Sequence, residues 1–380
     1  MVRIDRIRLE YTDRSKKFAL TADDKQNAFE RQYNHIYVAR LQALKRRILD
    51  AGKKQIGEIE YKQLEDIELF EKAFVIGTIT KRISIRPSVL KEIAEEELIV
   101  PEDYDDSEVI STASNRDFLE FEDEKQIVKL EVKSDVFNVE RIIWPTPCPQ
   151  NSWPTKKTGG VVAFLSGLEL TSNAVDNAIV ATAFELMSRW LNCELSPTCD
   201  PTSISRRIDR NRVKLDLVPG VGDPCPQQMP QQPIHRACLP RSSASGAALT
   251  LATNPYEFSL AGIDILATSG RAVSDLRRLS GVNSSCDLIE LMLRWQHIAP
   301  TCPDTVDGFP FENRDPFIMD GTFPHVMVVG NQPHPEFRWF ENTCGERCLM
   351  ISVPRFSQTQ LLVMLDLDTM DVYYEHFSVA

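Results

Sequence analysis

Apolar residues recur at helical spacing near the start of the chain and at strand spacing further on. Thr21 with Asp24 is typical of a capping box, and the apolar positions after it predict one amphipathic helix that ends at Gly52. Those apolar positions are Phe29, Tyr33, Ile36, Tyr37, Leu44 and Ile48. Two β-type runs, residues 73–79 and 127–132, then predict a small β-barrel, with the acidic stretch 95–106 between them as an exposed loop.

The second half of the chain shows buried-strand and helix patterns. Residues 161–165 form an apolar run that predicts a strand, and a helix with an apolar face from Val175 to Leu191 follows it. The alternation over residues 256–266 predicts a hairpin, and Ser284 starts a capped helix. Three further strands are expected at residues 325–329, 348–353 and 360–367.

These patterns divide the chain into parts. The Pro- and Gly-rich residues 144–160 predict an extended connection between two domains, because Pro removes ladder donors and Gly frees the backbone. We predict an N-terminal extension over residues 1–25, a helix with a barrel domain over 26–145, a linker over 146–160 and a sheet-rich α/β domain over 161–380.

Composition and charge limit the function classes. The net charge of -12 opposes a protein that grips nucleic acid over a broad surface, since that requires many Lys and Arg residues. The basic group Lys45, Arg46 and Arg47 could touch DNA, but a solvated helix end is the favoured interpretation. The charged start and the lack of a long apolar run predict an intracellular chain with no membrane partner. The nine cysteines form no C-x-x-C pair, which favours reduced thiols over structural zinc.

The most informative stretch is residues 215–224, an apolar strand that ends in a Gly-rich turn. Such turns deliver ligand-binding side chains in open α/β folds, and this one looks like a phosphoesterase turn without its metal chemistry. A binuclear metal site needs Asp, His and Asn ligands at the ends of several strands. This chain instead has Ser166 and Leu168 in the place of D-x-H, and Gly222 in the place of a histidine before Asp223.

The last expected ligand turn, G-H-x-H, is also altered. Asn331 and Pro333 occupy its two histidine positions. The degenerate positions are therefore Ser166, Leu168, Gly222, Asp223, Asn331 and Pro333. We predict no catalytic residue, no bound metal and no cofactor in this domain, and a structural role for Asp223 at the turn, because Asp before Pro favours turn initiation.

Two alternatives stay open. His325 and His334 flank the last turn and, with Asp223, could form a divergent metal-dependent phosphoesterase, although surface or loop histidines are favoured. A single-stranded DNA binder would use Phe74 and Phe121 for base stacking, but core or loop positions are favoured for both. The chain has no phosphate-binding loop G-x-x-x-x-G-K-[ST] and no nucleophile elbow.

Several ordered motifs carry a specific resemblance. They are residues 29–37, 86–90, 230–235, 253–256, 268–275, 297–305, 315–318 and 324–331. In these motifs the chain resembles the small (B) subunit family of DNA polymerase delta, from about Phe29 to near Ser357. The resemblance implies an OB-type β-barrel with a leading helix, packed on an inactive calcineurin-like phosphoesterase α/β sandwich.

The resemblance also implies a role and partners. Members of that family are non-catalytic accessory subunits that bridge the cysteine-rich C-terminal domain of the polymerase catalytic subunit to a third accessory subunit in the nucleus. We therefore expect a role in DNA replication and repair, with DNA reached mainly through the complex.

The chain departs from the family pattern in two places. A hairpin of the OB fold is expected after Phe137, and a strand, a turn and a helix are expected between Trp190 and Val213. Removing a barrel strand leaves unpaired backbone edges, so we expect an incomplete and weakened OB domain. Our hypothesis is a splice variant or a gene model that omits exons. Uninterrupted transcript reads through the codons for Phe137 and Asn138, with a stably folded product, would argue against a gene model that omits exons.

Overall fold

A six-stranded mixed sheet forms the centre of the molecule. The computed structural model describes residues 9–27, 30–57, 60–68, 71–82, 117–130, 139–169, 177–191, 214–240 and 249–377. In spatial order the sheet contains β1 (Tyr11–Asp13), β8 (Tyr256–Leu260), β9 (Ile263–Thr268), β10 (Val326–Gln332), β12 (Arg347–Pro354) and β11 (Glu336–Glu341). The inner strands β9, β10 and β12 are parallel. Strands β8 and β11 pair antiparallel with β9 and β12, and β1 pairs antiparallel with β8.

A smaller antiparallel sheet packs on one face of this sheet. It contains β14 (Val372–His376), β13 (Leu361–Asp366) and β5 (Val161–Phe164). Side chains such as Ile265, Val328 and Val363 fill the space between the two sheets and are almost completely buried. Burial of this much apolar surface is the main stabilising contribution to the layers.

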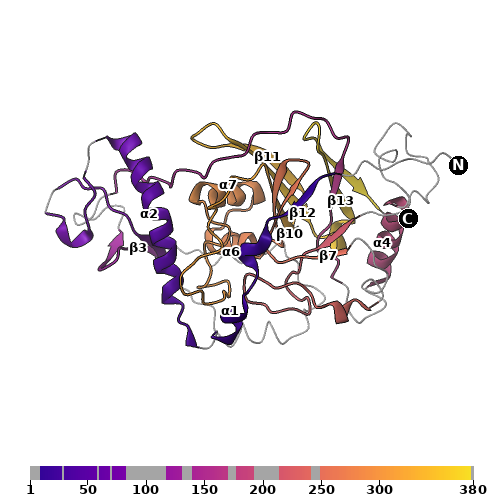
Figure 1. Cartoon of the computed structure of the whole chain (residues 1–380), viewed down its shortest axis with the longest axis horizontal. Coiled ribbons are helices and arrows are strands. Elements are labelled where there is room, and N and C mark those ends of the chain that lie inside the picture. Colours follow the sequence, from indigo (N-terminus) through magenta and orange to yellow (C-terminus); the bar gives the residue numbers. More distant parts are fainter. Residues whose placement is uncertain are drawn as a thin grey trace.

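Helices cover the outer faces of both sheets (Figure 1). On the large sheet, α6 (Arg271–Ser280) and α7 (Ser285–Trp295) bury Val273, Leu288 and Met292. On the small sheet, α4 (Asn177–Leu191) packs against Met364 of β13. The layers confirm the predicted sheet-rich α/β fold with helices outside.

The first half of the chain is mixed in structure. A short helix α1 (Ala22–Gln26) and a long helix α2 (Asn34–Ile56) precede a three-stranded antiparallel meander. The meander contains β2 (Thr78–Arg82), β3 (Phe118–Glu122) and β4 (Ile127–Leu130). Within the described residues the meander does not close into the expected barrel, because closure requires the two end strands to be paired. The acidic stretch 95–106 lies outside the described residues.

The single helix predicted from Thr21 to Gly52 is wrong. The capping box is confirmed, since Thr21 Oγ1 accepts from Asp24 N and Asp24 Oδ2 accepts from Thr21 N. However, α1 ends after one turn, and Arg31 reaches back to Asp24 at 2.7 Å and to Asp23 at 2.8 Å. Asn27 caps α1 with its backbone N–H on the Asp23 carbonyl, and α2 begins only at Asn34, so the chain leaves the helical path between them.

Other differences involve short or edge strands. The predicted extension 1–25 contains β1, which pairs with β8 and is part of the main sheet. Strands β11 and β14 were not predicted, and the strand expected at residues 73–79 lies at Thr78–Arg82. The hairpin, the capped helix and the three later strands are confirmed.

The remaining elements are short. They are the 3-10 helices η1 (Ser15–Phe18), η3 (Leu64–Asp66) and η6 (Arg236–Cys238), the helix α8 (Phe356–Thr359), and the paired strands β6 (Leu215–Leu217) and β7 (Leu249–Leu251). All described cysteines are free thiols, as the sequence predicted. Among the described helices, none combines the length and the hydrophobicity that a membrane crossing requires.

Candidate functional site

The strand ends that the sequence singled out converge at one place in the fold. Ser166 follows β5, and its Oγ accepts a hydrogen bond of 2.7 Å from the backbone N–H of Asn331 at the end of β10. The side-chain Nδ2 of Asn331 donates to the carbonyl of Ser269, which follows β9, at 2.9 Å. Gly220, which follows β6, lies beside Asn331 and Ser269. A Cβ added at Gly220 would sit 3.6 Å from Asn331 Nδ2 and 3.7 Å from Ser269 Cβ.

Two buried amide side chains extend this cluster. Asn254 Nδ2 donates to Ser269 Oγ at 2.6 Å and to Gln231 Oε1 at 2.7 Å, while its Oδ1 accepts from Ser269 N. Gln231 Nε2 in turn donates to the Gly220 carbonyl at 3.1 Å. Residues 166, 220, 231, 254, 269 and 331 thus form what we call the strand-end network. Asn254 and Gln231 were not predicted as site residues, although both lie in the motifs that carried the family resemblance.

The strand-end network consists of hydroxyls, amides and backbone groups that bind one another. Asp223 is the carboxylate nearest to it, and its Oδ2 accepts from Gly220 N at 2.7 Å. The backbone N–H of Asp223 also donates to the Gly220 carbonyl, which closes the turn. Among the described residues no group of three or more His, Cys, Asp and Glu side chains is arranged to hold a metal ion.

The other degenerate positions do not join the network. Leu168 packs against the apolar cluster beneath α4. Gly222 lies at the exposed tip of the turn with φ +90°, and a Cβ added there would meet open space. Pro333 follows the last residue of β10. The network therefore unites two of the six predicted positions, Ser166 and Asn331, with the Asp223 turn beside them.

His325, His334 and Asp223 are not brought together. His325 precedes β10, whereas Asn331 lies near its other end, so about 20 Å of strand separates them. His325 is completely buried: Nδ1 accepts from Asp264 N and Nε2 donates to the Asn151 carbonyl, both at 2.9 Å. Burial lowers the pKa of His325. The prediction that His325 flanks the turn as a surface or loop residue is wrong, whereas His334 is exposed.

The basic group on α2 is not a solvated helix end. Arg47 donates to the carbonyls of Thr146 and Met319 at 2.7 and 2.8 Å, and to Gln296 Oε1. Lys45 forms an ion pair with Glu124, so Arg46 is the exposed cation of the three. The interpretation given for Arg47 is therefore corrected, because this side chain attaches α2 to the second half of the chain.

The aromatic residues considered for base stacking pack against other parts of the chain. Phe121 of β3 is buried, and the half-buried Phe74 ring lies against the backbone of Gly52. Burial leaves Phe121 without the free face that base stacking requires, and the Phe74 ring is engaged with Gly52. The core or loop interpretation is confirmed for both.

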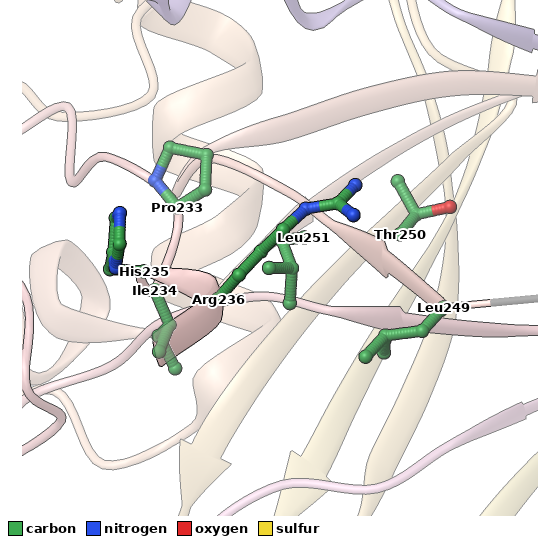
Figure 2. Close-up of a pocket in the computed structure, with 7 residues that line it drawn as sticks. All are labelled: Pro233, Ile234, His235, Arg236, Leu249, Thr250 and Leu251. Carbon is green, nitrogen blue, oxygen red and sulfur yellow. The ribbon is translucent and has the colours of Figure 1, made fainter. Parts of the chain in front are cut away.

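A shallow hollow of about 540 Å³ lies near the network. Figure 2 shows residues 233–236 of the Pro-rich loop on one side and residues 249–251 around β7 on the other. His235 Nδ1 accepts from Ala237 N within the loop. The lining combines aliphatic side chains with one imidazole and one guanidinium, and it contains no carboxylate that could act as a general acid or base.

Comparisons with known proteins identify the family. The family model "DNA polymerase delta subunit OB-fold domain" matches residues 32–172, and the model for the (B) subunit of DNA polymerase alpha/epsilon matches residues 202–338. The probable DNA polymerase delta small subunit of Caenorhabditis elegans is 35% identical over 97% of both chains. The DNA polymerase delta small subunit of Saccharomyces cerevisiae is 28% identical over 91% of this chain and 89% of its own, and DNA polymerase delta subunit 2 of Drosophila melanogaster is 29% identical over 99% of both.

The alignments also bear on the internal deletions. The alignment with the C. elegans protein spans 445 positions, more than the 380 residues of this chain, so it contains gaps in this chain. Residues 131–138 and 192–213, where most of the two expected departures fall, lie outside the described residues, so the places of the departures stay a prediction. The resemblance inferred from the sequence is confirmed: the chain belongs to the family of DNA polymerase delta small subunits, which are accessory and non-catalytic subunits of a replicative polymerase.

Proposed function

We propose that this chain is the scaffold that joins the catalytic subunit of DNA polymerase delta to a third accessory subunit. It would bind the catalytic subunit through that subunit's cysteine-rich C-terminal domain and act in the nucleus, in DNA replication and repair. DNA would be reached mainly through the assembled complex, as the net charge of -12 favours.

The strand-end network is the observation that carries this proposal. The Asn331 N–H is bound to Ser166 Oγ, and the Asn331 amide is bound to Ser269, at the positions where metal ligands are expected. A metal-dependent hydrolase needs convergent anionic or imidazole ligands with open coordination positions. Groups that saturate one another support a structural role for Ser166 and Asn331, with Asp223 in the turn beside them. We assign no metal, cofactor or catalysis to these positions or to Leu168, Gly222 and Pro333, whose side chains supply no metal ligand.

The domain division follows from the same interpretation. We assign residues 161–380 to a degenerate calcineurin-like phosphoesterase domain, a fold that the two packed sheets with outer helices support. Residues 26–145 form a helix with an incomplete OB domain, after an extension over 1–25 and before a linker over 146–160. Arg47, bound to Thr146, Met319 and Gln296, supports a fixed arrangement of these parts, which a scaffold requires.

A bridging pull-down tests the proposal. The catalytic subunit's C-terminal domain is immobilised, and the third accessory subunit is added with or without this chain. We expect the third subunit to be retained when this chain is present and lost when it is omitted. Retention that does not depend on this chain would refute the bridging role, and a folded chain that is itself not retained would refute the scaffold function.

A further inference from the structure

A groove with a volume of about 420 Å³ lies where α2 meets the second half of the molecule. Four segments line it: the end of α2, residues 142–147, the end of α7, and the turn between β11 and β12. A volume in this range is typical of a ligand-binding cleft.

Apolar side chains form part of the groove wall, beside polar ones. Trp144 is 36% exposed and packs on Trp295, with 6.3 Å between the ring centroids. Ile142 is 53% exposed, while Leu293 and Phe340 form a buried base. A partly exposed Trp beside an exposed Ile is an apolar surface that a partner's side chain could cover, and aromatic side chains of this kind often anchor protein interfaces.

Internal hydrogen bonds hold the walls of the groove in place. Thr146 N donates to the Arg47 carbonyl, and Cys148 N donates to Gln296 Oε1 at 2.9 Å. On the opposite wall, Asn342 Nδ2 donates to Glu346 Oε2 at 2.8 Å and holds the β11–β12 turn. Because these walls are fixed by internal hydrogen bonds, little ordering would oppose association.

The mouth of the groove carries positive charge in a chain that is acidic overall. Lys54 lines the groove, Lys53 precedes it on α2, and Arg141 donates to the Gln55 carbonyl nearby. Within the described part of the chain no carboxylate forms an ion pair with Lys53, Lys54 or Arg141. Glu341 is the acidic residue of the lining. An acidic ligand would therefore be attracted by Lys53, Lys54 and Arg141 at the groove.

We propose that this groove binds an acidic segment of a partner protein, with one large apolar side chain of the segment against Trp144 and its carboxylates near Lys54. A protein segment fits better than a nucleic acid, because a phosphate backbone needs a longer row of cations and makes no use of the buried apolar floor that Leu293 and Phe340 form. The proposal extends the scaffold function by naming the chemistry of one partner segment.

Fluorescence anisotropy with the full chain tests the proposal. The probe is a short fluorescein-labelled peptide with a central Trp-Leu pair between Asp and Glu residues. A charge-reversed peptide with Lys in place of the acids, and a labelled oligothymidine, are the comparison probes. We expect the acidic peptide to bind, and to bind about tenfold more weakly to each of the variants Trp144→Ala and Lys54→Glu.

Matched variants control for general effects. Lys25→Glu makes the same charge change on the exposed face of α1, away from the groove, and should leave peptide binding unchanged. Trp144→Phe preserves an aromatic ring against Trp295, and thermal unfolding of each variant reports whether it is folded. The proposal is overturned if the acidic peptide binds no better than the charge-reversed one, or if folded Trp144 and Lys54 variants bind it as the unaltered chain does.

Two further outcomes are decisive. Oligothymidine binding that depends on Trp144 and Lys54, without acidic-peptide binding, would make the groove a nucleic-acid surface and overturn the proposal. The scaffold function can be refuted separately, because the bridging pull-down does not depend on the peptide assay. A chain that bridges the other subunits but fails the peptide test refutes the groove alone.

Discussion

The guanidinium Nε of Arg40 lies 2.7 Å from Oδ2 of Asp315, whose side chain is completely buried. His297 Nε2 lies 2.8 Å from the same oxygen, and Arg40 Nη2 donates to the Cys302 carbonyl at 2.7 Å. Arg40 belongs to α2, whereas its partners belong to the second half of the chain. This cluster therefore fixes the leading helix to the sheet domain at one end, as Arg47 does further along the helix.

Replacing Arg40 with Met should lower the free energy of unfolding by about 3–5 kcal/mol, because it leaves the Asp315 carboxylate buried with one partner removed. Urea denaturation of the full chain at neutral pH measures the change. Arg46→Met is the matched control, since Arg46 is exposed on the same helix and its loss should cost less than about 0.5 kcal/mol. Equal effects of the two substitutions would contradict the anchoring role.

Stability should fall as the pH drops below about 6.5. Burial and the neighbouring Arg40 lower the pKa of His297, and burial lowers the pKa of His325, relative to the ordinary value of 6.5. Below about pH 6.5 the two histidines take up protons in the unfolded chain but not in the folded chain. Their contribution to the free energy of unfolding is therefore complete above that pH and decreases below it. Chemical denaturation over about pH 5 to 8 measures the trend.

The variant His297→Gln separates the two histidines. This variant should show a smaller change of stability between pH 5 and 8, but still some change, since His325 remains. Asp315 contributes at lower pH: burial raises its pKa, but His297 and Arg40 outweigh burial and hold the pKa below the ordinary 3.8. That contribution is present above pH 3.8 and is lost as the pH falls further. A stability that does not change between pH 5 and 8 would refute the assignment of neutral, buried histidines.

Two glycines at the strand ends provide a matched pair of substitutions. Gly270 and Gly222 have φ of +92° and +90°, so an added side chain strains both equally. A Cβ at Gly270 would lie 1.9 Å from the Gly330 carbonyl, whereas a Cβ at Gly222 meets nothing within 4 Å. Gly222→Ala should cost about 1 kcal/mol and Gly270→Ala about 3 kcal/mol or more, measured by denaturation. Similar costs would show that the Gly330 carbonyl does not restrict the space at Gly270.

Asp223 should affect stability and not hydrolysis. Asp223→Ala removes the acceptor for Gly220 N and should cost about 1 kcal/mol, while Asp223→Asn retains an acceptor oxygen and should recover part of it. Metal analysis after dialysis with Mn²⁺ should give well under one ion per chain. Two bound transition ions, with phosphodiester hydrolysis that Asp223→Ala abolishes, would instead establish a divergent phosphoesterase.

The predictions from the sequence succeeded where local pattern and burial agree. The Tyr256–Leu260 and Ile263–Thr268 hairpin combines regular alternation with a turn at Ala261, and the Ser284 cap starts a helix with one clear apolar face. Strands β1 and β11 carry weaker signals. Three residues of β1 are ordered by pairing with β8, a tertiary contact that no local pattern encodes.

The candidate site was predicted in part for a related reason. Ser166 and Asn331 could be aligned with expected ligand positions, and they do meet. Gln231 and Asn254 reach the network from loops, so their role depends on how distant segments fold together. His325 was expected beside the last turn because it is close to Asn331 in the sequence. An extended strand, however, places residues six apart at its opposite ends.

The most direct test of the scaffold function is the mass of the complex between this chain and the C-terminal domain of the polymerase catalytic subunit. Size-exclusion chromatography with light scattering gives that mass for purified components. We expect a one-to-one complex that forms equally well with the unaltered chain and with Asp223→Ala, since the strand-end turn is structural. A folded chain that elutes alone, with no complex at any mixing ratio, would contradict the scaffold function.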